Sequence, residues 1–327
     1  MSLVRREYEN LGLSAEVIDI IMASWRPDSQ KQYASYLKRW ISFCNERKAD
    51  VSNPAITDAL EFLSSLYYQS NLGYSAINTA RSALSIIFPV SDGCTFGTLP
   101  VVKRFMKGIF ESRPSLPRYS GIWDVSIVFD YVESLGEVEL SSLYELTIRL
   151  TGLLALLTSQ RRQTLHCLDI SASSMIEKGN ELTFVVGKKV KQTRPGCHQA
   201  PLVLKSFPNN PKLCVVRHVK QYLLITKSLR GDTTSLFICT TKPHKAASKD
   251  TISRWIRTLL QRAGVPAIFS AHSTRAAASS AAASVNVPID VILQNAGWQS
   301  QTTFATYYNK DIVSHDVNFC EHLQNRT

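Results

Sequence analysis

AHSTRAAASSAAASVNVPIDVILQNAGWQSQTTFATYYNK, residues 271–310, is the most informative stretch of the chain. His272 and Arg275 lie three positions apart at the start of a predicted helix, so their side chains share one side of its first turn. A tyrosine pair, Tyr307 and Tyr308, stands near the end of the stretch. A His-x-x-Arg pair alone arises often by chance. The order and context of the whole set therefore carry the argument.

Three more residues complete a set of cations and hydrogen-bond donors. Arg161, in TSQRRQTL (158–165), follows a long apolar predicted helix, and Lys191, in KKVKQTRPG (188–196), lies in a predicted β-hairpin. Trp298 follows a glycine at the end of a predicted helix, and the tyrosine pair comes nine and ten residues later. No carboxylate cluster or metal-ligand quartet accompanies these residues in the sequence.

This inventory suits attack on one phosphate diester without a metal. Two guanidinium groups supply fixed planar forks for phosphate oxygens, which a pair of lysines would not reproduce. A tyrosine can act as nucleophile and form a covalent phosphotyrosine that stores the bond energy for rejoining. Because the free pKa of tyrosine is about 10, the site has to help its proton leave.

The charge of the chain is concentrated in one segment. The whole protein carries a net charge of +11, but residues 161–275 hold 20 Lys and Arg against 5 Asp and Glu, a net of +15. Residues 1–115 hold 13 against 11. Such a block is better explained by a polyanionic partner, with nucleic acid first, than by a merely solvated surface. Binding through it should weaken steeply with salt.

The composition sets the class of protein. Hydrophobic residues make up 44% and charged residues 19%, which is typical of a globular protein. No secretory pattern opens the chain, and no apolar run approaches the roughly 20 residues that cross a bilayer. We therefore expect no membrane association and no secretion. Seven scattered cysteines without a CxxC pair predict free, mostly buried thiols. His166-Cys167 and Cys197-His198 match no usual zinc module, so no metal and no cofactor are expected.

The first third of the chain reads as helical. Periodic apolar residues predict four helices, with Asp28 or Ser29 capping the first, Ser75 capping the third and Pro89 ending it. The helices cover residues 29–48, 56–70, 75–88 and 99–112. The fourth offers three cations near one face, which either bind an anion or form a solvated face; they are Lys103, Arg104 and Lys107. ESRPSLPRYSG (111–121) is the best linker, because its prolines disfavour helix.

The rest of the chain predicts a mainly helical domain with a small sheet. Alternating apolar residues around a polar, glycine-containing turn predict a β-hairpin over residues 181–204. Helices are expected from about Val125 and Ser141, the second continuing through the apolar LTGLLALLT from Leu150. Further helices are expected over 213–226, 248–264, 272–285 and 288–297. The alanine- and serine-rich composition after Arg275 indicates close helix packing, a structural role. The expected fold class is mainly α with a small β-sheet (α+β).

These motifs, taken together, resemble those of the tyrosine recombinase (phage-integrase) superfamily. The resemblance implies an N-terminal helical core-binding (SAM-like) domain over residues 1–113 and a catalytic domain with a C-terminal tail over 114–327. TSQRRQTL is similar to the family's T-G-x-R-x-x-E-L stretch, which assigns Arg161 rather than Arg162. It departs at Ser159, where glycine is usual, and at Thr164, where an acidic residue is common. AGWQSQTTFATYYNK looks most similar to eukaryotic mobile-element recombinases of the DIRS or Crypton kind.

The resemblance also implies a role for each site residue. The residues that would bind the scissile phosphate are Arg161, His272, Arg275 and Trp298. His272 and Lys191 would manage protons, with Lys191 favoured as the acid for the leaving oxygen. Lys188 and Lys189 are alternatives for the hairpin lysine. Together with Arg194 they are also expected to contact DNA. Trp298 stands where histidine is common and can donate a hydrogen bond but cannot carry a proton.

Either tyrosine of the pair could be the nucleophile. Tyr307 fits the nine-residue spacing of many family members, and Tyr308 fits the FYNK-like ending of mobile-element members. We favour Tyr308, with Tyr307 as the alternative. The tail, DIVSHDVNFCEHLQNRT (311–327), either docks on a neighbouring subunit, as in the family, or folds back on its own domain.

The implied function is site-specific DNA recombination or integration through a 3′-phosphotyrosyl intermediate, independent of metal. The implied partner is double-stranded DNA, with a homo-tetramer in the synaptic complex and a monomer or weak oligomer when free. The location would be the nucleus if the protein is eukaryotic, and otherwise the cytoplasm. Two alternatives stay open: a catalytically silent DNA-binding protein of the same fold, and a type IB topoisomerase, whose usual larger accessory regions are not evident.

Overall fold

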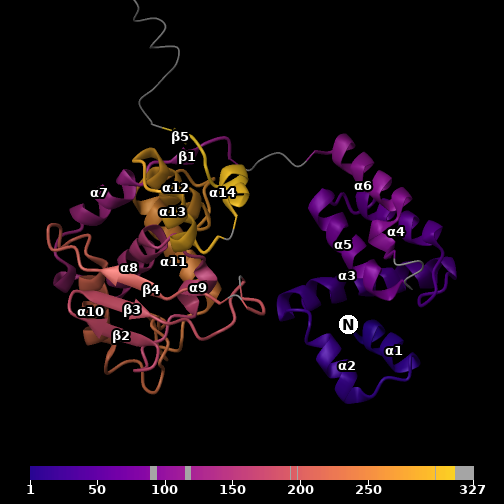
Figure 1. Ribbon diagram of the computed structural model, residues 1–327, viewed down its shortest axis with the longest axis horizontal. Helices are drawn as coiled ribbons and strands as arrows, with labels where there is room; N and C mark the ends of the chain where they lie inside the picture. Colours follow the sequence, from indigo (N-terminus) through magenta and orange to yellow (C-terminus); the bar gives the residue numbers. More distant parts are fainter. Residues whose placement is uncertain (89–93, 115–118, 192, 197, 299, 314–327) are drawn as a thin grey trace, which may run out of the picture. The chain divides into compact units, whose positions relative to one another are not determined.

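The computed structural model describes residues 1–88, 94–114, 119–191, 193–196, 198–298 and 300–313. The chain divides into two compact units, an N-terminal unit, Met1–Arg118, and a C-terminal unit, Tyr119–Thr327. The last helix of the N-terminal unit ends at Ser112, and the domain boundary expected after residue 113 stays a prediction (Figure 1). Among the described residues, every helix is too short or too polar to cross a bilayer.

The N-terminal unit is a helical bundle. Its helices are α1 (Ser2–Asn10), α2 (Ala15–Met22), α3 (Pro27–Arg47), α4 (Ile56–Tyr68), α5 (Tyr74–Ile87) and α6 (Pro100–Ser112), with a short 3-10 helix η1 (Phe96–Thr98). The core centres on Trp40 of α3, which is fully buried and packs edge-on against Phe62 of α4 at a centroid distance of 5.3 Å. The four predicted helices are confirmed as α3 to α6. Helices α1 and α2 were missed, because two turns show little periodicity.

Two predicted helix starts in this unit are wrong. Helix α3 begins at Pro27 with Arg26 as its N-cap, so Asp28 and Ser29 lie inside the helix. Proline is well suited to the first turn, because the N–H it lacks would have no partner there. Helix α5 begins at Tyr74 after Gly73, which places Ser75 inside its first turn. Pro89, the predicted end of this helix, lies outside the described residues.

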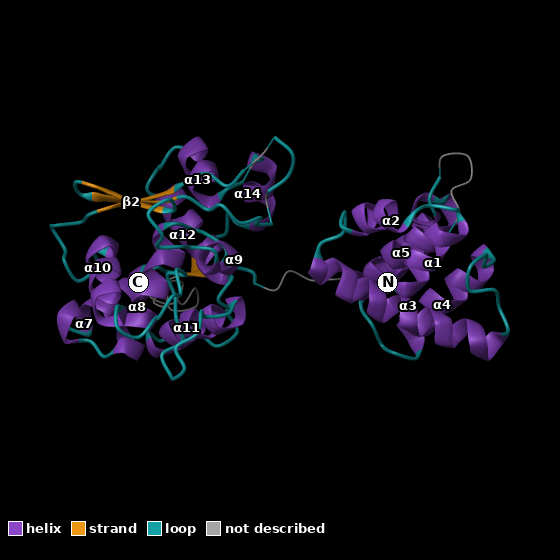
Figure 2. Cartoon of the chain, turned by 90° about the horizontal axis from the view of Figure 1, so that it is seen from below, coloured by secondary structure: helices purple, strands orange, loops and turns teal. Residues whose placement is uncertain are grey.

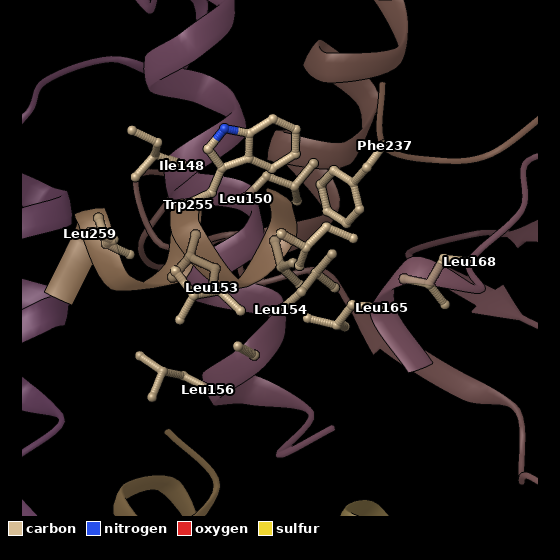
Figure 3. Packing of buried hydrophobic residues seen from close by; sticks show 14 of the residues in the cluster. Ile148, Leu150, Leu153, Leu154, Leu156, Leu165, Leu168, Phe237, Trp255 and Leu259 are labelled. Atoms are coloured by element: carbon tan, nitrogen blue, oxygen red, sulfur yellow. The ribbon is translucent and has the colours of Figure 1, made fainter. Parts of the chain in front are cut away.

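The C-terminal unit is built around one buried helix. Its helices are α7 (Ser126–Ser134), α8 (Leu143–Leu157), α9 (Arg162–His166), α10 (Val215–Thr226), α11 (Lys249–Arg262), α12 (Ser273–Ser284), α13 (Ile289–Ala296) and α14 (Gln301–Tyr307), with a 3-10 helix η2 (Val138–Leu140). Helix α8 is buried on nearly all sides, and its leucines pack with Trp255 and Phe237 (Figure 3). A Cβ at Gly152 would lie 1.9 Å from Leu259 Cδ2, so glycine lets α11 approach α8 closely.

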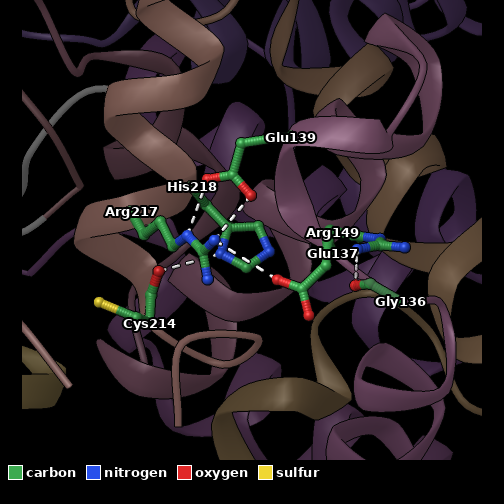
Figure 4. Close-up of polar contacts among 7 residues, drawn as sticks. All are labelled: Gly136, Glu137, Glu139, Arg149, Cys214, Arg217 and His218. Atoms are coloured by element: carbon green, nitrogen blue, oxygen red, sulfur yellow. Dashed lines mark hydrogen bonds and ion pairs between the residues drawn. The ribbon is translucent and has the colours of Figure 1, made fainter. Parts of the chain in front are cut away.

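Ion pairs at the surface join α10 to the segment around η2 (Figure 4). Arg217 of α10 forms ion pairs with Glu139 at 2.7 Å and with Glu137 at 3.4 Å. The neighbouring His218 is fully buried, with Nδ1 3.0 Å from the carbonyl oxygen of Cys214. Burial lowers the pKa of His218 to about 4, so this imidazole is neutral at pH 7. These residues consolidate the side of the unit that carries the sheet.

The main sheet has three antiparallel strands in the order β2-β3-β4. The strands are β2 (Met175–Lys178), β3 (Glu181–Phe184) and β4 (Leu202–Lys205). Phe184 pairs with Leu202, so β3 and β4 confirm the predicted hairpin. Strand β2 was missed, because it is a largely exposed edge strand without apolar alternation. Within the described part of the chain, helices and this small sheet confirm the expected fold class (Figure 2).

A second, two-stranded sheet joins the beginning and the end of the C-terminal unit. Strand β1 (Ile122–Trp123) pairs in parallel with β5 (Ile312–Val313). The first residues of the tail therefore fold back on their own unit, and the tail beyond Val313 lies outside the described residues. Figure 1 shows β1 and β5 beside the group formed by α12, α13 and α14.

Candidate active site

Helices α12, α13 and α14 bring the C-terminal motif residues together. His272 is the N-cap of α12, and Arg275 lies in its first turn. Helix α13 ends at Gly297, whose left-handed φ of 65° turns the chain so that Trp298 follows directly. Ser300 then caps α14 by accepting from the backbone N–H of Thr302, at 3.2 Å.

Tyr308 lies at the centre of this group. Its hydroxyl oxygen is 3.2 Å from His272 Nε2, and its ring centroid is 4.3 Å from that of Trp298. The guanidinium carbon of Arg275 lies 5.5 Å from the same ring. Tyr308 is half-buried, whereas the side chain of Tyr307 is 66% exposed. The structure thus places Tyr308 among the other motif residues and leaves Tyr307 at the surface.

Arg275 is the buried cation of the site. It is only 1% exposed, and its two terminal nitrogens donate to the carbonyl oxygens of Ser159 and Ala296. These carbonyls lie at or just beyond the C-terminal ends of α8 and α13, where helix dipoles favour a cation. Burial, and then the charge of Arg161, lowers the pKa of Arg275 to about 10. The guanidinium therefore stays protonated at neutral pH.

Arg161 and Arg162 have different surroundings. Arg162 is exposed and forms a surface ion pair with Asp250 at 2.8 Å. Arg161 is the half-buried N-cap of α9, and its charge acts on both His272 and Arg275. The structure accordingly places Arg161 beside the other site residues, as the resemblance implied.

His272 is a neutral imidazole in a positively charged surrounding. The residue as a whole is exposed, yet partial burial of the ring lowers the pKa of His272 to about 4. Nearby positive charges lower the pKa further; they belong to Arg275, Arg161, Lys191 and Arg162. At pH 7 the ring is therefore uncharged, and its Nε2 can accept a proton from the Tyr308 hydroxyl.

The predicted hairpin lysine approaches the site from the β3–β4 connection. Lys191 is exposed on this connection and is close enough to lower the pKa of His272. Lys188, Lys189 and Arg194 are exposed on the same connection, and Lys188 lies near Asp169 and Cys167. Three predicted DNA contacts belong to the other unit, where they are exposed on α6: Lys103, Arg104 and Lys107.

Several polar groups of the site have no hydrogen-bond partner within the described residues. Three of them are buried donors: Nη1 of Arg161, Nε of Arg275 and Nε1 of Trp298. Because buried donors are normally paired, three unpaired ones beside an excess of positive charge suit the binding of an anion. The described residues contain no group of three His, Cys, Asp or Glu side chains that could hold a metal.

Several contacts that hold the site have little signal in the sequence. Ser159 and Ala296 act through backbone carbonyls, which carry no residue signature. Ser280 of α12 bonds to the backbone at Tyr308, although its alanine-rich surroundings were interpreted as structural. A lone serine in a small-residue helix offers no spacing that would single it out.

Ser159 adopts a left-handed conformation, with φ at 49°. Non-glycine residues in this region cost about 1–2 kcal/mol, which gives a physical reason for the glycine that is usual here. We expect Ser159→Gly to raise the free energy of unfolding by up to about 1 kcal/mol, since the backbone strain is relieved and the carbonyl bound by Arg275 is retained.

Denaturant unfolding of purified variants measures this gain. Ser159→Ala is the matched control, because it removes the same hydroxyl but keeps the backbone strain. Equal stabilities of the glycine and alanine variants would contradict the strain argument.

A protein-family model described as Phage integrase family matches residues 130–312. No curated protein sequence matches the chain. Among solved structures, the chain is similar to XerH site-specific recombinase bound to palindromic difH substrate in a post-cleavage complex, with a TM-score of 0.57 and 17% identity over 85% of this chain and 75% of that one.

Two other solved structures are similar to the chain. The Tn1549 transposon integrase in complex with transposon right end DNA gives a TM-score of 0.53 and 10% identity, over 83% of this chain and 85% of that one. A lambda integrase dimer bound to a COC' core site gives 0.52 and 13%, over 90% and 94%. At these sequence identities the structural similarity shows the fold alone.

Proposed function

We propose that this chain, which belongs to the phage integrase family, is a site-specific DNA recombinase or integrase. It would cleave and rejoin DNA through a 3′-phosphotyrosyl intermediate without a metal. One observation carries the proposal: the Tyr308 hydroxyl lies 3.2 Å from the neutral His272, beside three open buried donors. A nucleophile, a proton acceptor and phosphate ligands are thus within reach of one another.

In the cleavage step, the Tyr308 hydroxyl oxygen attacks the scissile phosphorus. The Tyr308 O–P bond forms as the bond from phosphorus to the 5′-oxygen breaks, and the phenol proton passes to His272 Nε2. The leaving 5′-oxygen takes a proton from Lys191, the exposed lysine on the β3–β4 connection. Rejoining is the same step in reverse, with a 5′-hydroxyl as the attacking group.

Preorganised charge would stabilise the transition state. Arg275 is held by two carbonyls before any ligand arrives, and its Nε remains open. Arg161 and Trp298 each add a buried open donor. Donors fixed in this way lower the barrier most where negative charge develops, on the non-bridging oxygens of the phosphate.

The proposed partner is double-stranded DNA. The basic residues 161–275 and the DNA-bound state of the similar solved structures support it. The proposed contacts are Lys188, Lys189 and Arg194 in the catalytic domain (114–327), and Lys103, Arg104 and Lys107 in the core-binding domain (1–113). We further propose a homo-tetramer in synapsis, a monomer or weak oligomer when free, and a mobile-element origin of the DIRS or Crypton kind with a nuclear location.

Loss of two loop lysines should reduce the salt dependence of DNA binding. Each phosphate contact contributes about 0.9 to the slope of log affinity against log salt. We therefore expect the Lys188→Ala/Lys189→Ala variant to bind more weakly and to lose up to about 1.8 from that slope. Fluorescence anisotropy at several salt concentrations measures it.

Lys205→Ala provides the control for this measurement. Lys205 is an exposed lysine of β4 that pairs with Glu181 at 3.6 Å. Its substitution should leave the slope unchanged. A double variant with the wild-type slope would remove the two loop lysines from the DNA contacts.

Covalent trapping tests the proposed reaction. Purified protein is incubated with DNA that contains a candidate site and a nick through which the cleaved fragment escapes, with EDTA present. We expect a protein–DNA adduct on a denaturing gel, mapped to Tyr308 by mass spectrometry. Tight, salt-sensitive binding of the same DNA without an adduct would instead indicate a catalytically silent DNA-binding protein.

A further inference from the structure

We propose that Ser280 is a positioning residue for Tyr308. Its hydroxyl forms hydrogen bonds with the carbonyl oxygen of Tyr308 and with the backbone N–H of Lys310. This inference rests on the proposed function, since it concerns the reach of the attacking hydroxyl. We call Ser280 together with the Tyr308–Lys310 backbone the serine clamp.

The clamp consists of two hydrogen bonds to one hydroxyl. Ser280 Oγ donates to the carbonyl oxygen of Tyr308 at 2.8 Å and accepts from the backbone N–H of Lys310 at 3.0 Å. Ser280 is only 3% exposed, so water competes poorly for these bonds. The Ser280 hydroxyl thus donates one hydrogen bond to the segment that carries the tyrosine and accepts another from it.

The segment needs such a partner because helix α14 ends there. The backbone N–H groups of Tyr308 and Asn309 both donate to the carbonyl oxygen of Phe304, at 2.9 and 2.8 Å. The carbonyls of a last helical turn have no partner within the helix. Ser280 satisfies the Tyr308 carbonyl and fixes the direction in which the chain leaves α14.

Two further contacts hold the chain downstream of the tyrosine. Lys310 Nζ donates to the carbonyl oxygen of Tyr119 at 3.3 Å, and the N–H of Ile122 donates to the carbonyl oxygen of Asp311 at 2.9 Å. Both contacts lie beyond Tyr308 in the sequence. Within the described residues, the serine clamp is the side-chain hydrogen bond that reaches the Tyr308 backbone.

The position of Ser280 in the sequence gives the clamp its effect. Helix α12 carries His272, Arg275 and Ser280, so one rigid element holds the proton acceptor, a phosphate ligand and the anchor of the nucleophile. Residues held on one helix keep their mutual distances. A displacement of about 1 Å at a reacting group can cost about 100-fold in rate.

Ser279 provides a matched control on the same helix. It is 1% exposed, and its hydroxyl donates within α12 to the carbonyl oxygens of Arg275 at 2.6 Å and Ala276 at 3.3 Å. Loss of this hydroxyl removes a buried serine contact without touching the segment at Tyr308. Any difference between the two alanine variants therefore reports on the clamp.

The first experiment measures single-turnover cleavage at saturating nicked DNA, together with the Kd for DNA. We expect Ser280→Ala to cleave about 10- to 100-fold more slowly with an unchanged Kd, and Ser279→Ala to stay within about 2-fold of wild type. Ser280→Thr, which keeps the hydroxyl, should recover most of the rate. Equal rates for wild type and Ser280→Ala would overturn the positioning role, as would a failure of Ser280→Thr to exceed Ser280→Ala.

The second experiment does not depend on catalysis. Amide hydrogen exchange is followed in a peptide that covers residues 308–310 of the full chain. We expect faster exchange in Ser280→Ala than in Ser279→Ala, because the Lys310 N–H loses its acceptor. Faster exchange in Ser280→Ala, together with a wild-type protein that forms no adduct in covalent trapping, would refute the proposed reaction and keep the clamp. Identical exchange in both variants would overturn the clamp itself.

Discussion

Tyr308→Phe abolishes the covalent protein–DNA adduct, whereas Tyr307→Phe leaves it at the wild-type level: this is the largest effect that we expect. The reason is the placement of the two hydroxyls. The Tyr308 hydroxyl oxygen is 3.2 Å from His272 Nε2, and its ring packs on Trp298, while Tyr307 is 66% exposed. Phenylalanine keeps the ring packing and removes the hydroxyl oxygen of residue 308, which is the atom that would bond to phosphorus.

Trapping on nicked DNA followed by peptide mapping measures this difference. Both single variants should bind the DNA with the wild-type Kd, because neither hydroxyl is needed for binding in our proposal. The reverse pattern, with the adduct lost only in Tyr307→Phe, would move the nucleophile one residue earlier and would keep the reaction. An adduct in both single variants would require another nucleophile.

Arg275→Lys is expected to slow cleavage by about 100- to 1,000-fold, the usual effect of losing a preorganised donor at developing negative charge. The two terminal nitrogens of Arg275 bond to the carbonyl oxygens of Ser159 and Ala296. A single lysine ammonium cannot reach both carbonyl oxygens in this planar geometry and also present an unpaired donor like Nε of Arg275. At least one buried carbonyl would lose its partner, so the free energy of unfolding should fall by about 1–3 kcal/mol.

Single-turnover rates and denaturant unfolding check the two parts of this prediction separately. Arg262→Lys is the control, since Arg262 is exposed on α11 and lies over the ring of Tyr144 at 5.6 Å. It should change neither the rate nor the stability appreciably. A cleavage rate within a few-fold of wild type in Arg275→Lys would show that charge alone suffices at this position.

Much of the fold could be predicted because long helices repeat their pattern. Helices α3 to α6 and the long buried α8 carry apolar residues over three or more turns, and each was expected near its observed bounds. The elements that were missed are short: α1, α2, α9, α14 and the strands β1, β2 and β5. A few residues cannot establish a period, and such elements depend on tertiary contacts for their stability.

Residue types and their order along the chain already define the chemical groups that this protein can offer. Residue type decides whether a group is a nucleophile, a cation or a proton acceptor, and the spacing of His272 and Arg275 places both in one helical turn. The order of the motifs indicated the family, and the match to residues 130–312 agrees. These properties are local or compositional, so they can be predicted from the sequence without a structure.

How these groups meet in space depends on the packing of the helices. It separates Tyr308 from its exposed neighbour, sets Arg161 apart from the surface pair of Arg162, and brings Ser280 to the backbone at Tyr308. It also explains Ser159 by a left-handed backbone whose carbonyl holds Arg275. Each of these depends on segments far apart in the chain or on a backbone torsion. Residue type and periodicity do not encode contacts between distant segments or a single backbone torsion, because these arise only when the helices pack.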